Sequence, residues 1–323
     1  MSMESSYAFC TIVTSNYLPF ARVLQHSLRL NGIKNQFHVL VVDNIKINEL
    51  QNQSNNSFKI WTVRDIEKGY QIDHHLINYH RNNNLDHFRW ALKPVFTIFL
   101  LEHGHEYVFY TDPDIYFTGN PSFLINEFQS YSILLTPHWR NISNVDQDLF
   151  SLLKDGYFNA GFLGASKKGK AHLKWLETAC KEKMEQNLTL GTFDDQKYLD
   201  ILCLEFDDVK TIRHRGCNIA NWNIHTNKRV RVKNKLLINS QYEPIFIHFT
   251  NDTIINVLNL NDELLKPHLE EYIRLLKIHG FNLLEKIDNF ELDNHNTLFY
   301  KMKYKLRLRT RLKNLLLKLA KKI

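Results

Sequence analysis

The chain has 323 residues, of which 44% are hydrophobic and 23% charged, so it can bury the core of a large domain, and a disordered chain is excluded. Its four cysteines (Cys10, Cys180, Cys203 and Cys217) include no Cys-x-x-Cys pair and are read as reduced, mostly buried thiols of a cytosolic protein. The net charge of +7 is unevenly placed, because ten Lys or Arg and no acidic residue lie between Lys301 and Ile323. Residues 1–300 therefore carry −3, and a partner for basic charge is expected at the C-terminal tail only.

Short apolar runs alternate with amphipathic helical patterns over the first two-thirds of the chain, which predicts an α/β fold with a central mixed, mainly parallel sheet. The predicted strands are Ala8–Thr14, Phe37–Val42, Phe58–Trp61, Tyr107–Thr111, Ser132–Thr136, Ala160–Ala165 and Ile245–Phe249. The predicted helices are Phe20–Leu30, Phe88–Leu101 and a third through Ala171–Leu176.

The connecting segments divide the chain further. The Asn-rich stretch Arg81–Asp86 is read as a loop, and residues 140–157 as a loop or short helix that forms a mobile lid. A helix is predicted from Glu263 with Gly280 as its stop. We therefore expect a main domain over residues 1–262 and a C-terminal helical extension over 263–323.

Ligands of open α/β sheets bind beyond the carboxyl ends of the strands, so the polar residues that follow each strand are the first candidates. Thr14, Asn16 and Tyr17 follow the first predicted strand, and Asp43 follows the second. The strand Tyr107–Thr111 leads directly into Asp112-Pro113-Asp114.

The Asp-Pro-Asp motif predicts a metal site. A residue before proline is pushed into the extended region, and side chains two apart on an extended chain point the same way, so Asp112 and Asp114 should face one side. Two carboxylates suit Mg²⁺ or Mn²⁺, which stabilises the charge that grows on a departing diphosphate. A bare Asp-x-Asp also occurs in surface turns, and the apolar strand before it favours the metal site.

His248 closes the last predicted strand and is the candidate third metal ligand. The alternative is a buried histidine whose ring is satisfied by the backbone. His103 and His105 are read as solvated loop residues.

Four motifs in order carry a family resemblance: Asp112-Pro-Asp114, Phe158-Asn-Ala-Gly-Phe162, Asp195-Gln196 and His248-Phe-Thr250. Over about residues 7–250 the chain resembles retaining glycosyltransferases of the GT-A fold, especially the family 8 type that includes bacterial lipooligosaccharide galactosyltransferases and glycogenin. It is also similar to a group of bacterial glycosyltransferases with Lys-Pro ahead of the first motif and Asn-x-Ala-x-Trp-Asn after the second, here Lys93-Pro94 and Asn218 to Asn223.

The resemblance implies roles residue by residue. Asp112, Asp114 and His248 would hold Mn²⁺ or Mg²⁺, with Asp112 also near the ribose. Asn16 and Tyr17, with Thr14 before them, match the loop that holds the nucleotide. Asn159 and Ala160 would line the donor-sugar pocket, and Gly161 would allow close approach of the backbone. Asp195 would contact sugar hydroxyls, Gln196 would lie under the anomeric carbon, and Lys93 or Arg89 would reach the diphosphate or the sugar.

The chain departs from the family pattern after His248. The family often places a Gly and then Lys-Pro-Trp there, whereas Thr250-Asn-Asp-Thr253 follows here, so another cation is needed and Arg213 and Arg215 are candidates. Simpler readings also stand for single motifs. Asn159-Ala-Gly would be a strand start with a tight turn, Asp194-Asp195 a helix N-cap, and Trp222 a core residue.

The C-terminal tail predicts contact with a membrane surface. Leu312, Leu315, Leu316, Leu319 and Ile323 form one helical face among lysines, as in basic amphipathic helices that lie on anionic membranes. The alternatives are packing on the acidic body or a disordered tail. No nucleic-acid module is recognised. No signal peptide or membrane-spanning run is expected, so the prediction is a cytoplasmic protein peripheral on the inner membrane face.

The function predicted is metal-dependent transfer of a hexose from a nucleotide-sugar, with UDP as the expected nucleotide, to a glycan or lipid-linked acceptor in polysaccharide biosynthesis. Retention of anomeric configuration is the expected outcome. The alternatives are an Asp-x-Asp phosphatase and an inactive, membrane-associated glycan- or nucleotide-binding protein. A phosphatase of that type places its motif near the start of the fold, whereas over 100 residues precede Asp112 here.

Overall fold

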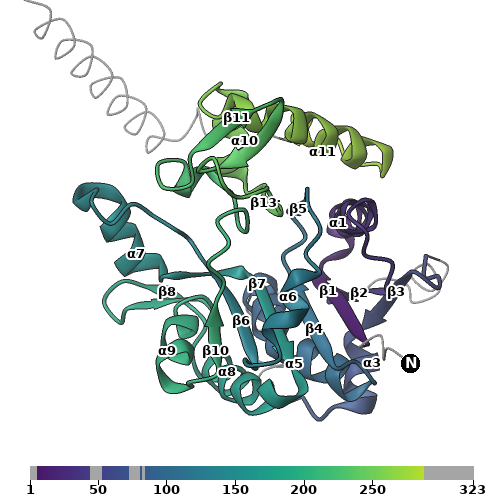
Figure 1. Cartoon of the computed structure of the whole chain (residues 1–323). Helices are drawn as coiled ribbons and strands as arrows, with labels where there is room; N and C mark the ends of the chain where they lie inside the picture. The colour runs from purple at the N-terminus through teal and green to yellow at the C-terminus, as the bar shows by residue number, and fades with distance from the viewer. Residues whose placement is uncertain (1–5, 44–52, 73–80, 82–83, 287–323) are drawn as a thin grey trace, which may run out of the picture. The chain divides into compact units, whose positions relative to one another are not determined.

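The computed structural model describes residues 6–43, 53–72, 81 and 84–286 (Figure 1). The chain divides into two compact units, Met1–Tyr272 and Ile273–Ile323, and each is described by itself. Among the described residues, the strands and the whole candidate site belong to the first unit.

A seven-stranded sheet forms the centre of the first unit. In spatial order its strands are β10 (Val209–Thr211), β6 (Ile133–Pro137), β7 (Phe158–Ser166), β4 (Tyr107–Thr111), β1 (Tyr7–Val13), β2 (Phe37–Val41) and β3 (Phe58–Thr62). Only β7 runs antiparallel to its two neighbours, and the other pairings are parallel. The predicted mixed, mainly parallel sheet is therefore confirmed.

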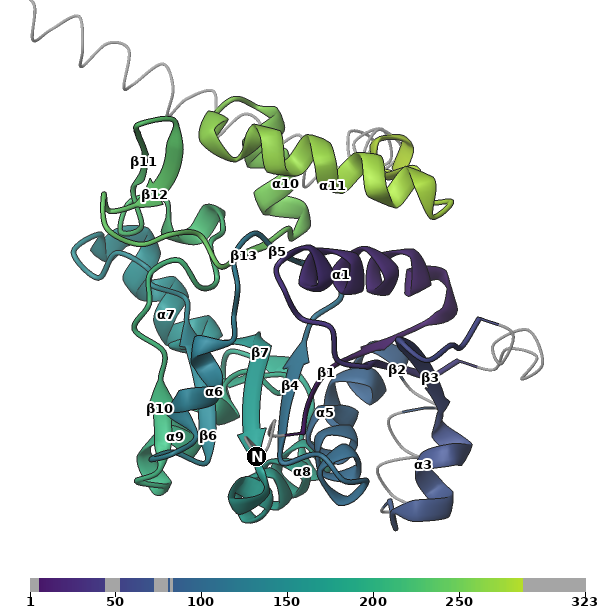
Figure 2. The same cartoon turned by 45° about the vertical axis from the view of Figure 1, so that its right-hand side comes forward.

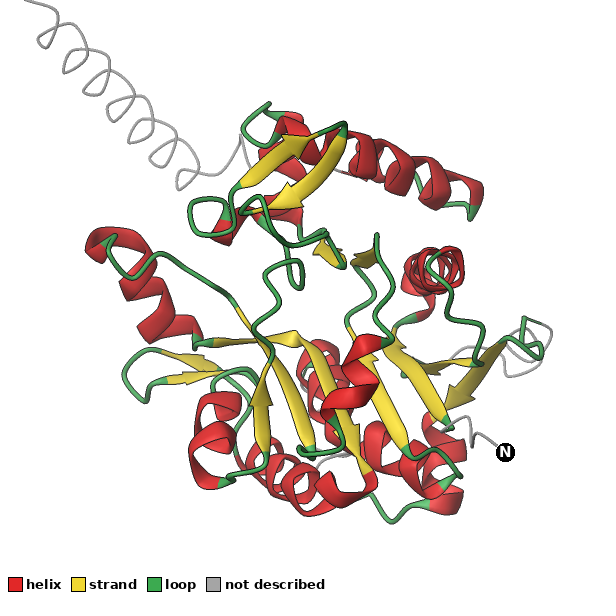
Figure 3. Ribbon diagram, in the orientation of Figure 1, coloured by secondary structure: helices red, strands yellow, loops and turns green. Residues whose placement is uncertain are grey.

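Helices cover both faces of the sheet, as Figure 3 shows, and each face has its own apolar core. One core contains α5 (Leu85–Glu102), α8 (Lys170–Glu182), α9 (Tyr198–Glu205) and α3 (Val63–Gly69). The other contains α1 (Leu18–Leu30) and α6 (Phe123–Glu127). Because both faces are covered, the central strands are almost continuously apolar rather than alternating.

Three two-stranded sheets accompany the central one. They pair β5 (Ile115–Phe117) with β13 (Phe246–His248), β8 (Gln186–Asn187) with β9 (Thr192–Phe193), and β11 (Arg229–Val232) with β12 (Lys235–Ile238). The shorter helical elements are η1 (Ser15–Tyr17), η3 (Val145–Leu149), α7 (Phe150–Asp155), η4 (Lys167–Gly169), η5 (Asn221–Asn223), α10 (Asn251–Leu258) and η6 (Glu263–Leu265).

Two sequence-based assignments are corrected. The last predicted strand forms as β13, but it pairs with β5 instead of joining the main sheet. The predicted loop Arg81–Asp86 extends too far along the chain, because α5 already begins at Leu85. The Asn84 side chain caps this helix by accepting hydrogen bonds from the backbone N–H groups of Asp86 and His87. Of the two readings of residues 140–157, helix holds for η3 and α7.

Of the second unit the structure describes residues 273–286. Helix α11 (Lys266–Ile278) begins in the first unit and ends two residues before Gly280, whose φ of +85° suits glycine and fits the predicted stop. The basic tail lies outside the described residues. Within the described ranges, no helix has both the length and the apolar character needed to span a bilayer.

A buried histidine on β2 makes the stability of the fold depend on pH. His38 is 2% exposed, and its Nδ1 accepts a hydrogen bond of 3.0 Å from Trp61 Nε1, which requires an unprotonated Nδ1. Burial, with the charges of His105 and Lys59, lowers the pKa of His38 from 6.5 to about 3. The folded state therefore holds this ring neutral.

Because the pKa of His38 is lower in the folded than in the unfolded chain, its stabilising effect is present above pH 6.5 and is lost as the pH falls toward 3. Between pH 7 and pH 5 the free energy of unfolding should fall by about 2 kcal/mol more in the wild type than in His38→Gln. Glutamine keeps an acceptor for Trp61 but does not titrate. Urea unfolding at the two pH values measures this difference, and equal falls in both proteins would contradict the assignment.

Candidate metal centre

The Asp-Pro-Asp motif lies where β4 leaves the sheet. The backbone N–H of Ile115 donates to the Asp112 carbonyl at 3.1 Å, so the chain turns at Pro113 and Asp114 instead of continuing extended. The sequence argument for two carboxylates on one side of a strand was therefore wrong about the backbone. The two side chains still converge, because the turn folds Asp114 back toward Asp112.

The pairing of β5 with β13 brings His248 to these carboxylates. β5 starts directly after the turn, and His248 is the register partner of Ile115. The backbone N–H of Phe249 also donates to the Asp114 carbonyl at 2.9 Å. This pair lies beyond the end of β4 (Figure 2). A residue distant by more than 130 positions is thus fixed next to Asp114 by a short antiparallel ladder.

Asp112, Asp114 and His248 offer one ligand atom each, and these atoms lie within 4.8 Å of one another. The His248 Nε2 atom is 3.1 Å from an Asp114 carboxylate oxygen. Because both atoms carry lone pairs, a proton or a cation has to lie between them. Oxygen and imidazole ligands suit Mn²⁺, so the predicted residues fit a divalent cation. The backbone-satisfied alternative for His248 is wrong, since its two ring nitrogens face side chains.

The ionisation of this pair follows the same geometry. Burial opposes both charges, but the His248 ring lowers the pKa of Asp114 below its ordinary value. Burial likewise opposes protonation of His248, and the Asp114 carboxylate outweighs it, so the pKa of His248 is raised. Without a metal the pair therefore holds a proton, which a divalent cation would displace.

A bulge in β7 places part of that strand next to Asp112. Leu135 of β6 pairs with Leu163, but the next residue, Thr136, pairs with Asn159, so the stretch between them loops away from β6. Within that stretch the Gly161 carbonyl accepts a hydrogen bond of 2.7 Å from the Asp112 N–H. Bulges beside functional sites commonly redirect side chains in this way. The motif Asn159-Ala-Gly161 does lie at the start of a strand, as the simpler reading expected. The bulge brings it next to Asp112 as well.

Lys93 and Asp195 meet beneath the carboxylates. The Lys93 Nζ is 2.8 Å from Asp195 Oδ2, 3.7 Å from Asp112 Oδ1 and 3.0 Å from the Ala160 carbonyl, and its side chain is 6% exposed. Burial opposes its charge, but Asp112 and Asp195 raise the pKa of Lys93 above its ordinary value. The ammonium is therefore committed to protein groups, and contact of Lys93 or Asp195 with a donor stays a prediction.

Gln196 is held by the backbone on two sides. Its Nε2 donates to the Asp155 carbonyl at 2.7 Å, and its Oε1 accepts from the Ala160 N–H at 3.1 Å. The helix-cap alternative for the preceding aspartates is wrong, because α9 begins at Tyr198 and no side chain caps it. Gln196 is consequently a fixed amide whose oxygen borders Ala160, at the place where the resemblance puts the donor sugar.

The loop after β1 is placed at the same edge of the sheet. Thr14 donates to the Asn16 side-chain oxygen, and the Tyr17 ring is 39% exposed and stacks on Phe20 at 4.8 Å. Asp43 is not free for a ligand, because both its oxygens accept hydrogen bonds from Ser15. Nucleotide binding by Thr14, Asn16 and Tyr17 stays a prediction.

The Asn-x-Ala-x-Trp-Asn segment, residues 218–223, is hydrogen-bonded to the end of β6 through two side-chain amides. Asn218 Nδ2 donates to the Pro137 carbonyl at 3.1 Å, and Asn223 Nδ2 donates to the His138 carbonyl at 3.1 Å. These hydrogen bonds fix Trp222, whose ring centroid lies 5.5 Å from the ring centroids of both His138 and His248. Trp222 is half-buried, and its ring packs against the candidate metal ligand His248, a contact that the core reading did not include.

The cation that replaces the family's lysine is not supplied by Arg215 in this structure. Its guanidinium lies 3.6 Å from the centroid of the Trp139 ring and donates to Asn227. Arg89, one helical turn before Lys93 on α5, is nearer to the carboxylates. Burial opposes its charge, but Tyr110, Asp112 and other acidic neighbours raise the pKa of Arg89. Its Nε makes no hydrogen bond to the residues that the structure describes.

Sequence reasoning missed two site residues for which signals existed. Tyr110 donates to Asp112 Oδ1 at 2.6 Å, as residues two apart on a strand can. His138 follows β6 at its carboxyl end, where ligand-binding residues were sought after other strands. Both side chains are buried.

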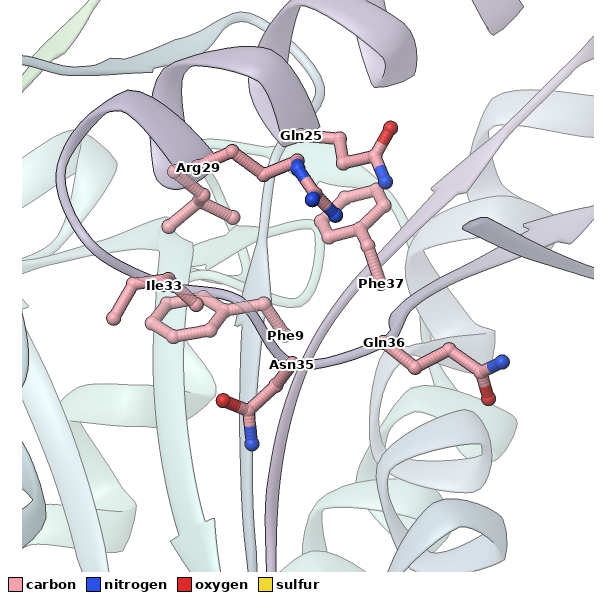
Figure 4. Close-up of a pocket in the computed structure, with 8 residues that line it drawn as sticks. Phe9, Gln25, Arg29, Ile33, Asn35, Gln36 and Phe37 are labelled. Atoms are coloured by element: carbon pink, nitrogen blue, oxygen red, sulfur yellow. The ribbon is translucent and has the colours of Figure 1, made fainter. Parts of the chain in front are cut away.

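The hollow in Figure 4, between α1 and the strands β1 and β2, is separate from this centre. It is lined by Phe9, Gln25, Leu28, Arg29, Ile33, Asn35, Gln36 and Phe37. Its amides have partners within the fold, since Gln25 donates to the Ser57 carbonyl and Asn35 to the Tyr7 carbonyl. It therefore contributes nothing to the site.

Comparison with known proteins supports the fold. No family model matches the chain. It is 26% identical over 264 residues to the uncharacterized protein YfnD of Bacillus subtilis (strain 168), covering 80% of this chain and 81% of that one. It is 24% identical over 256 residues to YfnF of the same organism, covering 77% and 83%.

Among solved structures, the chain is similar to the galactosyltransferase LgtC in complex with donor and acceptor sugar analogs. The TM-score is 0.53 at 15% identity, over 84% of this chain and 95% of that chain. The protein therefore has the GT-A glycosyltransferase fold, as the sequence resemblance predicts.

Gly161→Ala should weaken binding of a divalent cation. A Cβ atom there would lie 2.5 Å from His248 Cε1, 2.8 Å from Asn159 Oδ1 and 3.1 Å from Asp112 Oδ2, so the ligand set would have to separate. We expect the Mn²⁺ affinity, measured by electron paramagnetic resonance, to fall by about tenfold or more. Gly164→Ala on the same strand is the control, since its Cβ would meet only core side chains. Equal Mn²⁺ affinities in the two variants would refute this role.

Proposed function

We propose that the protein is a metal-dependent glycosyltransferase that moves a hexose from a nucleotide-sugar, a UDP-hexose, to a glycan or lipid-linked acceptor. The observation that carries the proposal is the convergence of Asp112, Asp114 and His248 at the carboxyl edge of a GT-A sheet. Ligands of open α/β sheets bind at that edge. LgtC, which shares the fold, is a galactosyltransferase crystallised with donor and acceptor sugar analogs.

The metal-ligand set fits Mn²⁺ or Mg²⁺, which when bound stabilises the charge on the departing diphosphate. Asp112, Asp114 and His248 would hold that cation. The Asp112 carboxylate is itself held by Tyr110 and faces Lys93, so it does not need to reorganise when the donor binds. Tyr17, with its exposed ring at the same edge, stacks on the base.

Asn159, Ala160 and Gly161 line the donor-sugar pocket, and Gln196 lies beneath the anomeric carbon. The Gln196 amide is fixed by Asp155 and Ala160, so its oxygen can stabilise positive charge at that carbon without moving. Asp195, oriented by Lys93, accepts hydrogen bonds from sugar hydroxyls. This arrangement favours transfer with retention, and the anomeric configuration of the product, assigned by nuclear magnetic resonance, checks it.

Two alternatives predict different chemistry. A phosphatase would need Asp112 as a nucleophile, but this carboxylate accepts a 2.6 Å hydrogen bond from Tyr110 and lies near Lys93, contacts that reduce its nucleophilicity. An inactive binding protein would keep metal and nucleotide affinity without turnover. Release of nucleoside diphosphate from a nucleotide-sugar separates it from an enzyme.

Metal and nucleotide should stabilise the protein together. With Mn²⁺ and UDP, or a UDP-hexose, at about 100 times the dissociation constant, the folded state should gain about 2.7 kcal/mol. The gain should vanish in Asp114→Ala, which removes a candidate ligand. It should persist in Asp207→Asn, because Asp207 is exposed and precedes β10, at the opposite edge of the sheet. Thermal unfolding with a panel of nucleotides measures it. Absence of any metal-dependent gain in a folded wild type would remove the main support for the proposal.

The basic tail is proposed to hold the enzyme on an anionic membrane surface at the cytoplasmic face, where a lipid-linked acceptor would lie. The proposal rests on the sequence of residues 301–323, which has ten Lys or Arg and leucines at a spacing that would place them on one face of a helix. Each basic residue near such a surface contributes about 1 kcal/mol of attraction.

Replacing Lys313, Lys318, Lys321 and Lys322 by Gln should release the protein from phosphatidylglycerol vesicles, because the attraction is electrostatic. Cosedimentation at low and high salt measures this. Four Lys→Gln changes at exposed positions of the body, such as Lys68, Lys154, Lys167 and Lys235, serve as the control. Binding that is unchanged by the tail substitutions would contradict the proposal.

A further inference from the structure

Three buried side chains form a hydrogen-bonded row that ends at the metal centre. His138, Asn159 and His248 are 3%, 6% and 4% exposed. His138 Nδ1 is 3.0 Å from the Gly156 carbonyl, and its Nε2 is 3.4 Å from Asn159 Nδ2. Asn159 Oδ1 is 3.2 Å from His248 Nδ1, and His248 Nε2 faces Asp114. The row therefore connects a backbone carbonyl after α7 to a candidate metal ligand.

Two backbone groups determine the role of every atom in this row. The Gly156 carbonyl can only accept, so His138 Nδ1 carries the hydrogen and the Nε2 of the neutral ring is an acceptor. The Gly161 N–H can only donate, and it lies 3.1 Å from Asn159 Oδ1. That end of the Asn159 amide is therefore the oxygen, and its NH₂ group faces His138.

The same logic fixes the tautomer of His248. The Asn159 oxygen can only accept, so His248 Nδ1 must donate to it. The remaining ring nitrogen, Nε2, then presents its lone pair toward Asp114 and the cation. Metal-binding histidines generally depend on such a partner for the nitrogen that does not bind the metal.

His138 is the closer of two acceptors for the Asn159 NH₂ group, since Gln196 Oε1 lies at 3.5 Å. Its own position is fixed from two sides. Asn223 donates to the His138 carbonyl, and the Trp222 ring packs against the imidazoles of both His138 and His248. Burial and the Arg140 charge lower the pKa of His138 to about 3, so the ring stays neutral and Nε2 remains an acceptor.

We propose that His138 is a positioning residue of the metal centre, which orients the Asn159 amide and thereby holds His248 as the tautomer that presents Nε2 to the cation. The inference rests on the metal role of His248 in the proposed function. The hydrogen bonds of the His138 ring go to the Gly156 carbonyl and to Asn159, and not to a candidate metal ligand. It acts only through Asn159.

The test uses Mn²⁺ alone as the probe, with affinity measured by electron paramagnetic resonance on the full chain. His138→Phe removes both ring nitrogens and should weaken Mn²⁺ binding by about 10- to 100-fold. His138→Gln, which can again accept from Asn159, should recover most of the affinity. His38→Phe is the matched control, because His38 is also a buried neutral histidine but lies on β2. It should lose stability and keep its Mn²⁺ affinity.

A second measurement needs no His138 variant and uses the diamagnetic ion Mg²⁺ as the probe, because without a metal a proton lies between His248 Nε2 and Asp114. With ¹⁵N-labelled histidine, the ring nitrogen shifts of His248 in the Mg²⁺-bound wild type, assigned by comparison with His248→Ala, report its tautomer. The proposal requires the hydrogen on Nδ1. A hydrogen on Nε2, or a folded His138→Phe that binds Mn²⁺ within twofold of the wild type, would overturn it. A wild type that binds Mn²⁺ but no nucleotide would instead count against the proposed function alone.

Discussion

The hydrogen bond from the Asp112 N–H to the Gly161 carbonyl, 2.7 Å long, is the contact on which the rest of the site depends. It joins the end of β4 to the bulged start of β7, and it forms only because β7 runs antiparallel to β4. The amino end of β7 consequently lies at the same edge as the carboxyl ends of the parallel strands. The absence of a side chain at Gly161 then lets His248 approach Asp112.

The balance of buried charges at this edge of the sheet favours binding of a cation. Asp112, Asp114 and Asp195 bring three carboxylates into a largely enclosed region, and Lys93 and Arg89 supply two fixed cations near them. Burial of unbalanced charge is costly, so the region favours a further positive charge. In the proposed function that charge is the divalent cation, which then attracts the diphosphate of the donor. Metal and nucleotide binding are expected to be coupled for this reason.

Much of the secondary structure could be predicted from the sequence, because the apolar patterns of strands and helices are local. The predicted strands at Tyr107–Thr111 and Phe37–Val42 match β4 and β2 to within a residue, since buried strands read as continuous apolar runs. The structure also brings the three metal-binding candidates together, although they lie far apart in the sequence. What local patterns could not supply was pairing, so β13 was assigned to the wrong sheet and the bulge in β7 was not foreseen.

The positions of Asp114 and Trp222 could not be predicted from the sequence for the same physical reason, which is that both depend on long-range contacts. Asp114 converges on Asp112 through a turn and not through an extended strand, and only the long-range ladder of β5 and β13 shows where that turn leads. The contact of Trp222 with His248 was likewise not visible in the sequence. It depends on the amides of Asn218 and Asn223, which bind the end of β6 more than 80 residues earlier.

The proposed function requires that His248 and the two aspartates hold a divalent cation that also binds a nucleoside diphosphate. Pulsed electron paramagnetic resonance of the protein with Mn²⁺ and UDP tests it directly, because the hyperfine couplings identify the nuclei bound to the metal. We expect a ¹⁴N coupling that disappears in His248→Ala and a ³¹P coupling from the diphosphate in the same complex. Bound Mn²⁺ without a ³¹P coupling, or with a ¹⁴N coupling that survives in His248→Ala, would contradict it.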